Sequence, residues 1–177
     1  MDTRLLHLVI VFLLGISLFS CSSKVTGISK ISKLPVAVKN HAVIVFLDTR
    51  CEHTLSVVPV LYHLQQIVDT NDQLILLINP NSNSVDSMHH FIHDHDLTQW
   101  RAYLDQMSQI AKVNQVTKNP YALIVDASNR VMYQGALVKT DQSDKWDEAP
   151  VIQALKKIEK GAKKYPNTIL NVGCQNQ

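Results

Sequence analysis

The chain has 177 residues, of which 46% are hydrophobic, 18% are charged and 6% are aromatic, with 5 glycines and 6 prolines. This content of apolar side chains is enough to bury a core, so it excludes collagen-like, low-complexity and largely disordered chains and predicts one ordinary domain. The net charge of +2 gives no indication of nucleic-acid binding, and 3 cysteines are too few for a disulfide-rich scaffold.

The first twenty residues have the pattern of an export signal. Arg4 supplies a basic start, and residues 5–19 are almost entirely apolar but shorter than the about 20 residues that a membrane-spanning helix needs. The tetrapeptide LFSC that ends at Cys21 resembles a bacterial lipobox, in which the cysteine is acylated after cleavage. This resemblance implies a lipoprotein signal peptide at 1–20 and a mature chain attached to a membrane through Cys21. Ser22 after the cysteine resembles outer-membrane sorting in Gram-negative bacteria, and an uncleaved anchor helix is the alternative.

The rest of the chain predicts a tether followed by alternating strands and helices. Residues 21–35 are rich in Ser, Lys and Thr and lack helical periodicity, which predicts a tether in front of a domain at 36–177. A continuous run of β-branched and aromatic residues at 42–48 predicts a strand buried on both faces, and the apolar periodicity of 54–69 predicts a helix. The remaining expected elements are a strand at 73–79, a helix at 85–95, a short strand at 100–104, a helix from Asp105 to about 114, a hairpin of 121–126 and 130–135, and a helix from 147 to about 161.

This order of elements predicts an α/β fold with a central mixed β-sheet flanked by helices. In such folds the chemistry is expected at the carboxyl end of the first strand, where a loop enters the N-terminus of a helix. Residues 48–54, with the sequence DTRCEHT, occupy that place. Export to an oxidising compartment would allow Cys51 and Cys174 to form a disulfide.

Four features of the sequence resemble the thioredoxin-like superfamily, and more closely its redoxin branch of exported thiol proteins. The segment VIVFLDTRCEHTLSVVPVL contains a buried strand, Cys51 at its end and Pro59 eight residues later. Pro120 stands before the strand YALIVD, at the position of the family's cis-proline. The hairpin VDASNRVMYQG resembles the family's last hairpin, and the Gly173-Cys174 pair resembles the ending of one redoxin group.

The resemblance implies a thioredoxin-like domain that carries out thiol–disulfide chemistry at Cys51 in the cell envelope. Its expected partners are exported protein thiols or disulfides, and neither a cofactor nor a metal ion is expected. A cis bond at Pro120 would place the backbone of residue 119 beside the sulfur, where it can pair with an extended substrate. One departure is large, because Thr54 stands where the family has the second cysteine of Cys-x-x-Cys.

The residues around Cys51 themselves favour a reactive thiol. A thiolate at a helix N-terminus faces unpaired N–H groups and the positive end of the helix dipole, which lowers its pKa. Arg50 and a protonated His53 act in the same direction, whereas Glu52 opposes them. Thr54 is expected to donate its hydroxyl to the sulfur in place of the missing thiol. We therefore expect the reduced Cys51 to be alkylated faster than Cys174.

A redox cycle at Cys51 needs a second sulfur, and Cys174 is the available candidate, since residue 54 is a threonine and Cys21 is expected to be acylated. We therefore expect a disulfide between Cys51 and Cys174, whereas the alternative is a free thiol on the C-terminal tail. A disulfide between Cys51 and Cys174 would require their two Cα atoms to come within about 4.4–6.8 Å.

Three other functions remain open at this point. Thr49 and Arg50 are available to polarise a peroxide, although the peroxiredoxin pattern places its threonine where this chain has Asp48. Metal binding by His89 and His93 on one helix face, or by Cys51 with His53 or His63, is a second alternative. The third is a thioredoxin-like module that binds a partner without turnover.

Overall fold

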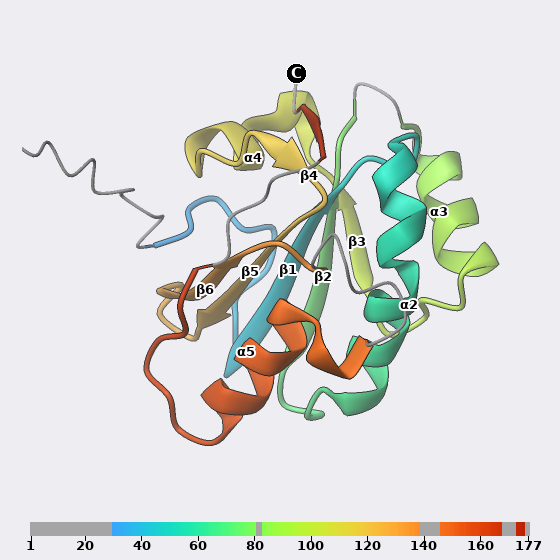
Figure 1. Ribbon diagram of the computed structural model, residues 1–177. Helices are drawn as coiled ribbons and strands as arrows, with labels where there is room; N and C mark the ends of the chain where they lie inside the picture. The colour runs from blue at the N-terminus through green and yellow to red at the C-terminus, as the bar shows by residue number, and fades with distance from the viewer. Residues whose placement is uncertain (1–29, 81–82, 139–145, 168–172, 176–177) are drawn as a thin grey trace, which may run out of the picture.

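A computed structural model of the chain describes residues 30–80, 83–138, 146–167 and 173–175 (Figure 1). The expected signal peptide, the lipidation site at Cys21 and most of the expected tether lie outside the described residues. In these ranges no helix has the length and the apolar character that crossing a bilayer requires.

The elements follow one another as the sequence predicts, with small differences at their ends. In chain order they are β1 (His41–Leu47), α2 (Glu52–Ile67), β2 (Gln73–Ile78), α3 (Val85–Asp94), β3 (Arg101–Leu104), the 3₁₀ turn η2 (Gln106–Ser108), α4 (Gln109–Val113), β4 (Lys118–Asn119), β5 (Tyr121–Asp126), β6 (Val131–Gly135), the 3₁₀ turn η3 (Trp146–Glu148), α5 (Pro150–Glu159) and β7 (Cys174–Gln175). The two-residue strands β4 and β7 were not expected from the sequence. They pair with each other in a separate two-stranded sheet.

The main sheet has five strands in the order β3-β2-β1-β5-β6. β1 pairs in parallel with β2, and β2 pairs in parallel with β3, whereas β5 runs antiparallel to both β1 and β6. The sheet is therefore mixed, as predicted. Because β1 and β2 are parallel, the loops that follow them leave the sheet at the same edge, and Cys51 lies in the first of these loops.

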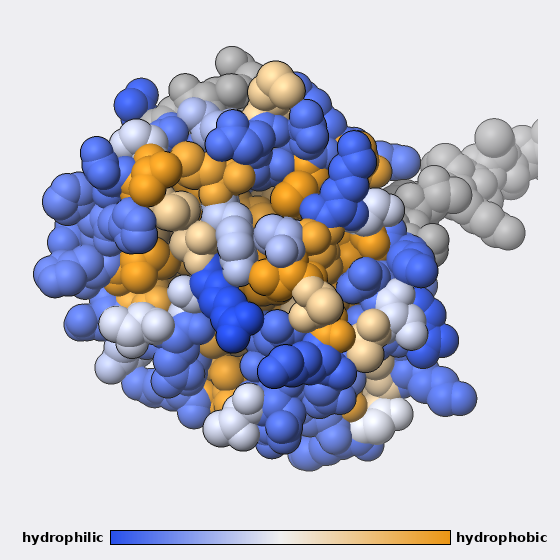
Figure 2. All heavy atoms as spheres, turned by 180° about the vertical axis from the view of Figure 1, so that it is seen from behind, coloured by the Kyte–Doolittle hydropathy of each residue, from blue (hydrophilic) through white to orange (hydrophobic). Residues whose placement is uncertain are grey.

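Successive side chains of β1 point to opposite faces of the sheet, and the hydrophobic core therefore has two layers, one on each face. Val43, Val45 and Leu47 face α2, α3 and α5, and the residues between them face the other side of the sheet. On that other side the main covering elements are the short helix α4 and the chain around Ile31 and Val38. Figure 2, the view from behind, shows hydrophobic residues gathered near the middle of this face and hydrophilic residues around them.

The end of the expected tether packs against the domain. Lys30 forms an isolated antiparallel bridge with Arg130, and the Ile31 side chain is 1% exposed. The backbone N–H of Ile31 donates to the carbonyl of Asn129 at 2.9 Å. The packed part of the chain therefore reaches back at least to residue 30.

The turn of the β5–β6 hairpin is held by the carboxylate of Asp126. This carboxylate accepts hydrogen bonds from the backbone N–H of Ser128 at 2.8 Å and of Arg130 at 3.0 Å, and it pairs with the Arg130 guanidinium at 2.7 Å. Burial alone would raise the pKa of this carboxyl, but the hydrogen bonds from Arg130 and Ser128 together hold the pKa below its usual range.

We expect Asp126→Asn to lower the free energy of unfolding by about 1–2 kcal/mol at pH 7, because the amide forms weaker hydrogen bonds than the carboxylate. A folded pKa below the unfolded value of about 3.9 means that the carboxylate stabilises the protein above that pH and that this stabilisation is lost as the pH falls through the folded pKa. Urea unfolding of both proteins at pH 7 and near pH 3 measures the difference, which should shrink at the lower pH. Equal stabilities at pH 7 would contradict the role assigned to Asp126.

Candidate active site

Cys51 is the N-cap residue of α2. β1 ends at Leu47, and the loop of Asp48, Thr49 and Arg50 carries the chain into the helix. The carbonyl of Cys51 accepts the N–H of Thr54 at 2.9 Å, which starts the helix directly after the cysteine. Because Cys51 is the N-cap residue, its side chain lies near the positive end of a 16-residue helix, and in the disulfide form it makes no capping hydrogen bond. This is the position that the sequence predicts.

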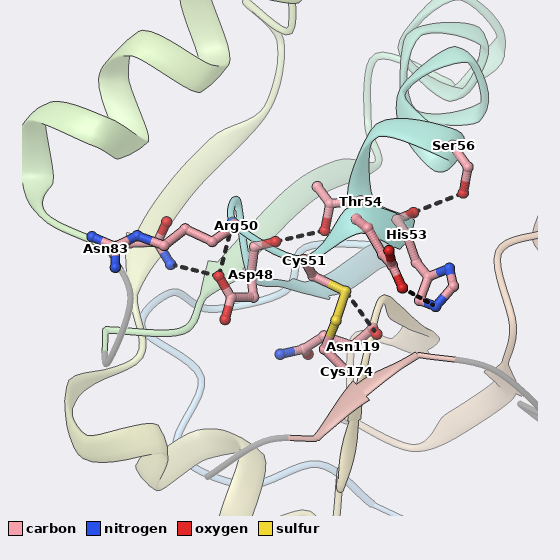
Figure 3. The surroundings of a disulfide bond; sticks show 10 residues. Asp48, Arg50, Cys51, His53, Thr54, Ser56, Asn83, Asn119 and Cys174 are labelled. Atoms are coloured by element: carbon pink, nitrogen blue, oxygen red, sulfur yellow. Dashed lines mark hydrogen bonds and ion pairs between the residues drawn. A yellow bond between two sulfur atoms is a disulfide. The ribbon is translucent and has the colours of Figure 1, made fainter.

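Cys51 is joined to Cys174 by a disulfide, which confirms the expected pairing. The Cα atoms are 6.0 Å apart, and the two residues are separated by 123 positions in the chain. Cys51 is 5% exposed, whereas Cys174 is partly exposed. The bond therefore connects a buried cysteine at the start of α2 with a partly exposed cysteine on β7 (Figure 3).

Pro120 lies beside this bond. The peptide bond between Asn119 and Pro120 is cis, as the resemblance implies, and the carbonyl oxygen of Asn119 lies 3.8 Å from the Cys51 sulfur. Asn119 itself is 1% exposed. Burial raises the pKa of the phenol of Tyr121, the residue that follows Pro120.

The C-terminal segment lies along the backbone in front of Pro120. β7 pairs antiparallel with β4, with Cys174 opposite Asn119 and Gln175 opposite Lys118. The resemblance implies that the backbone of residue 119 is available to an extended substrate. In this structure part of the chain's own C-terminal segment pairs with it.

Thr54 does not contact the sulfur in the way we expected. Its side chain is fully buried, and its hydroxyl donates to the carbonyl oxygen of Asp48 at 2.6 Å. The prediction that this hydroxyl donates to the Cys51 sulfur is therefore wrong for the disulfide form. A backbone carbonyl is a stronger acceptor than a disulfide sulfur, and the preceding loop brings one within reach. Thr54 holds this loop against the first turn of α2.

A network of polar side chains joins the loops after β1 and β2. The Asp48 carboxylate accepts the backbone N–H of Arg50 at 3.0 Å and the amide of Asn83 at 3.3 Å. Asn83 also donates to the carbonyl of Asn79 at 2.6 Å and pairs with the Thr49 hydroxyl. Asn83 was not among the residues predicted from the sequence. The only signal for it was its position after the second buried strand, at the edge where parallel strands end.

Arg50, His53 and His63 were the side chains considered for peroxide reduction or metal binding. Figure 3 shows the Arg50 side chain directed away from the disulfide, on the side of Asn83. The imidazole of His53 lies 3.6 Å from the Glu52 carboxylate, and His63 pairs with Asp147 at 3.0 Å.

The four histidines near α3 differ in their surroundings. His89, His90 and His93 are exposed, and the ring of His95 packs edge-on against Phe91 with the ring centres 4.8 Å apart. Over the described part of the chain, no group of three or more His, Cys, Asp or Glu side chains is placed to hold a metal ion.

No protein-family model and no curated protein matches the chain. In its structure the chain is similar to an uncharacterized conserved protein from Geobacillus kaustophilus, with a TM-score of 0.65 and 15% identity over 80% of this chain and 79% of that chain. It is also similar to a secreted disulfide oxidoreductase from Mycobacterium tuberculosis that is homologous to E. coli DsbE, with a TM-score of 0.55 and 15% identity over 68% of this chain and 84% of that chain. A third similar structure is the exposed lipoprotein thioredoxin of Streptococcus pneumoniae, with a TM-score of 0.53 and 11% identity over 68% of this chain and 87% of that chain.

These likenesses, together with the mixed five-stranded sheet and the helix that begins at Cys51, show that the chain has a thioredoxin-like α/β fold. The predicted fold class is therefore confirmed. Identities this low establish the fold alone, and the activity has to be argued from the site.

Proposed function

We propose that the protein is an exported thioredoxin-like thiol–disulfide oxidoreductase of the redoxin type, in which Cys51 and Cys174 are the redox pair. The observation that carries this proposal is the disulfide from the N-cap of α2 to Cys174, beside the cis bond before Pro120. The second sulfur that Thr54 cannot supply comes from the other end of the chain.

Two properties of the site, together with the likeness to solved structures, support redox chemistry over a purely structural disulfide. The Cys51 sulfur is at the start of a long helix, where a thiolate is stabilised. Cys174 is a partly exposed residue, which favours access of a partner thiol to the bond. Two of the similar solved structures are a disulfide oxidoreductase and a thioredoxin. Exported protein thiols or disulfides are the partners that this chemistry would serve.

The arrangement gives less support to peroxide reduction. That reaction needs a cationic side chain aimed at the bound peroxide, whereas Arg50 is directed away from the sulfur and Thr49 pairs with Asn83. A module that binds without turnover is the remaining alternative, and the experiment below separates it from an oxidoreductase.

The test is to equilibrate the purified protein in buffers of graded reduced and oxidised dithiothreitol, to trap free thiols with N-ethylmaleimide and to count them by mass spectrometry. We expect one reversible transition between the disulfide and two thiols, and catalysis of insulin reduction by dithiothreitol. Both should be lost in Cys51→Ser and in Cys174→Ser. A wild-type protein that reduces insulin no faster than these two variants would favour the binding module.

We also propose that Cys21 carries a lipid anchor that holds the protein to the cell envelope, facing the periplasm from the outer membrane in a Gram-negative host. The support is the lipobox-like sequence before Cys21. We expect Cys21→Ser to remain unprocessed, whereas the wild-type protein is shortened and recovered with membranes. Unmodified full-length wild-type protein in the soluble fraction would contradict the anchor.

A further inference from the structure

The two cysteines of the disulfide differ in their exposure to solvent. Exchange requires the thiolate to approach one sulfur along the line of the bond that breaks, from the side opposite the other sulfur. Cys51 is 5% exposed and Asn119 is 1% exposed. The carbonyl oxygen of Asn119 lies 3.8 Å from the Cys51 sulfur. Cys174 is partly exposed. Access therefore favours attack on the Cys174 sulfur.

The two possible leaving groups differ as well. Attack on Cys174 releases the Cys51 sulfur as a thiolate at the N-terminus of α2, where the backbone N–H groups and the helix dipole stabilise negative charge. Attack on Cys51 would release the thiolate of Cys174, which lies on the two-residue strand β7 and is not itself the N-cap residue of a helix. Because a better stabilised thiolate leaves faster, this difference favours attack on Cys174 too.

The pairing of β7 with β4 adds a third reason. A partner that pairs with the backbone of Lys118 and Asn119 to reach Cys51 would have to displace β7, which occupies that backbone. A partner that bonds to Cys174 leaves the pairing in place. The exposure of the two cysteines, the stability of the leaving thiolate and the pairing of β7 with β4 therefore all favour attack on the Cys174 sulfur.

We propose, on the basis of the redox function proposed above, that Cys174 is the sulfur that exchanges with the partner and that Cys51 is the internal thiol. A thiolate of an exported protein dithiol attacks the Cys174 sulfur, the bond to Cys51 breaks, and its electron pair leaves on Cys51. The product is a mixed disulfide between the partner and Cys174.

The second thiol of the partner then loses its proton to water and attacks the partner's own bonded sulfur, which expels the Cys174 thiolate. The partner dithiol is thereby oxidised to a disulfide by two electrons, and the Cys51–Cys174 pair is reduced to two thiols. The same steps in reverse transfer a partner's disulfide to this protein. The segment that carries Cys174 is thus the surface at which the partner reacts, and Cys51 holds the charge that is released.

The test uses reduced glutathione as a probe with a single thiol. The oxidised full-length protein is mixed with glutathione, quenched with acid at a series of short times, and treated with N-ethylmaleimide. Digestion with pepsin at low pH and mass spectrometry then identify which cysteine carries glutathione. Extrapolated to zero time, we expect at least a tenfold excess of glutathione on Cys174 over Cys51, with the maleimide on Cys51.

The matched control is the same oxidised protein in concentrated urea, where the fold no longer buries Cys51. We expect the preference for Cys174 to fall to about twofold or less there, because access to both sulfurs becomes similar. A preference that persists in urea would overturn the structural explanation, and glutathione found first on Cys51 of the folded protein would overturn the assignment itself. If glutathione and excess dithiothreitol both leave the folded protein's disulfide intact, the proposed redox function fails together with this inference.

Discussion

Loss of the Cys51–Cys174 disulfide is expected to lower the free energy of unfolding by about 3–5 kcal/mol. The bond closes a loop across 123 residues, and in the chain-entropy account a cross-link over such a distance removes a large part of the freedom of the unfolded chain. For a domain of this size the loss corresponds to a fall of about 10 °C in the midpoint of thermal unfolding. The effect acts mainly on the unfolded state, so the fold itself should persist without the bond.

The measurement is thermal unfolding of the oxidised wild type, the wild type reduced with excess phosphine, and Cys174→Ser. We expect the last two midpoints to coincide, since each lacks the same cross-link. The matched control is to treat Cys174→Ser with the phosphine, which should leave its midpoint unchanged. Oxidised and reduced wild-type proteins with equal midpoints would show that the bond contributes nothing to stability.

Most of the main sheet could be predicted because its signals lie within single segments. The unbroken apolar run of β1 indicates a strand buried along almost its whole length, and the periodicity of α2 indicates a helix with one buried face. α4 is shorter than expected for a local reason. Met107 and Ser108 have positive φ angles, so the helix begins only at Gln109.

Asp105 contacts the start of the helix as expected, but the helix begins later in the chain than we predicted. We expected it to cap a helix that begins directly after it. Its carboxylate does accept the N–H groups of Ile110 at 2.7 Å and Ala111 at 2.8 Å, but it reaches them across a 3₁₀ turn. The capping residue was identified correctly, and the intervening turn displaced the start of the helix.

The candidate site was only partly predictable, because its contacts join segments that are far apart in the sequence. The place of Cys51 follows from one strand and one helix, and its pairing with Cys174 was expected from the need for a second sulfur. The pairing of β4 with β7 involves only two residues on each side, which is too short for any periodicity. The choice of the Thr54 hydroxyl between a sulfur and a carbonyl depends on the loop conformation, which the sequence does not report.

In the reduced protein we expect the pKa of the Cys51 thiol to lie below the unperturbed value of about 8.5. The cause is its N-cap position on a 16-residue helix, where backbone N–H groups without helical partners favour the thiolate. Cys174 lies on a two-residue strand and should titrate close to the unperturbed value. The pH dependence of the alkylation rate, followed separately for the two cysteines by mass spectrometry, measures both pKa values.

Thr54→Val is the matched variant for this prediction, because valine keeps the shape of threonine and removes only the hydroxyl. The hydroxyl donates to the carbonyl of Asp48, so its removal should leave the Cys51 pKa unchanged within about 0.3 units and lower the free energy of unfolding by about 1–2 kcal/mol. A clear rise in that pKa would mean that the hydroxyl turns to the sulfur once the disulfide is reduced. A wild-type Cys51 pKa at or above 8.5 would have a larger consequence, since a helix N-terminus that does not stabilise the thiolate would leave the binding module as the better account of this site.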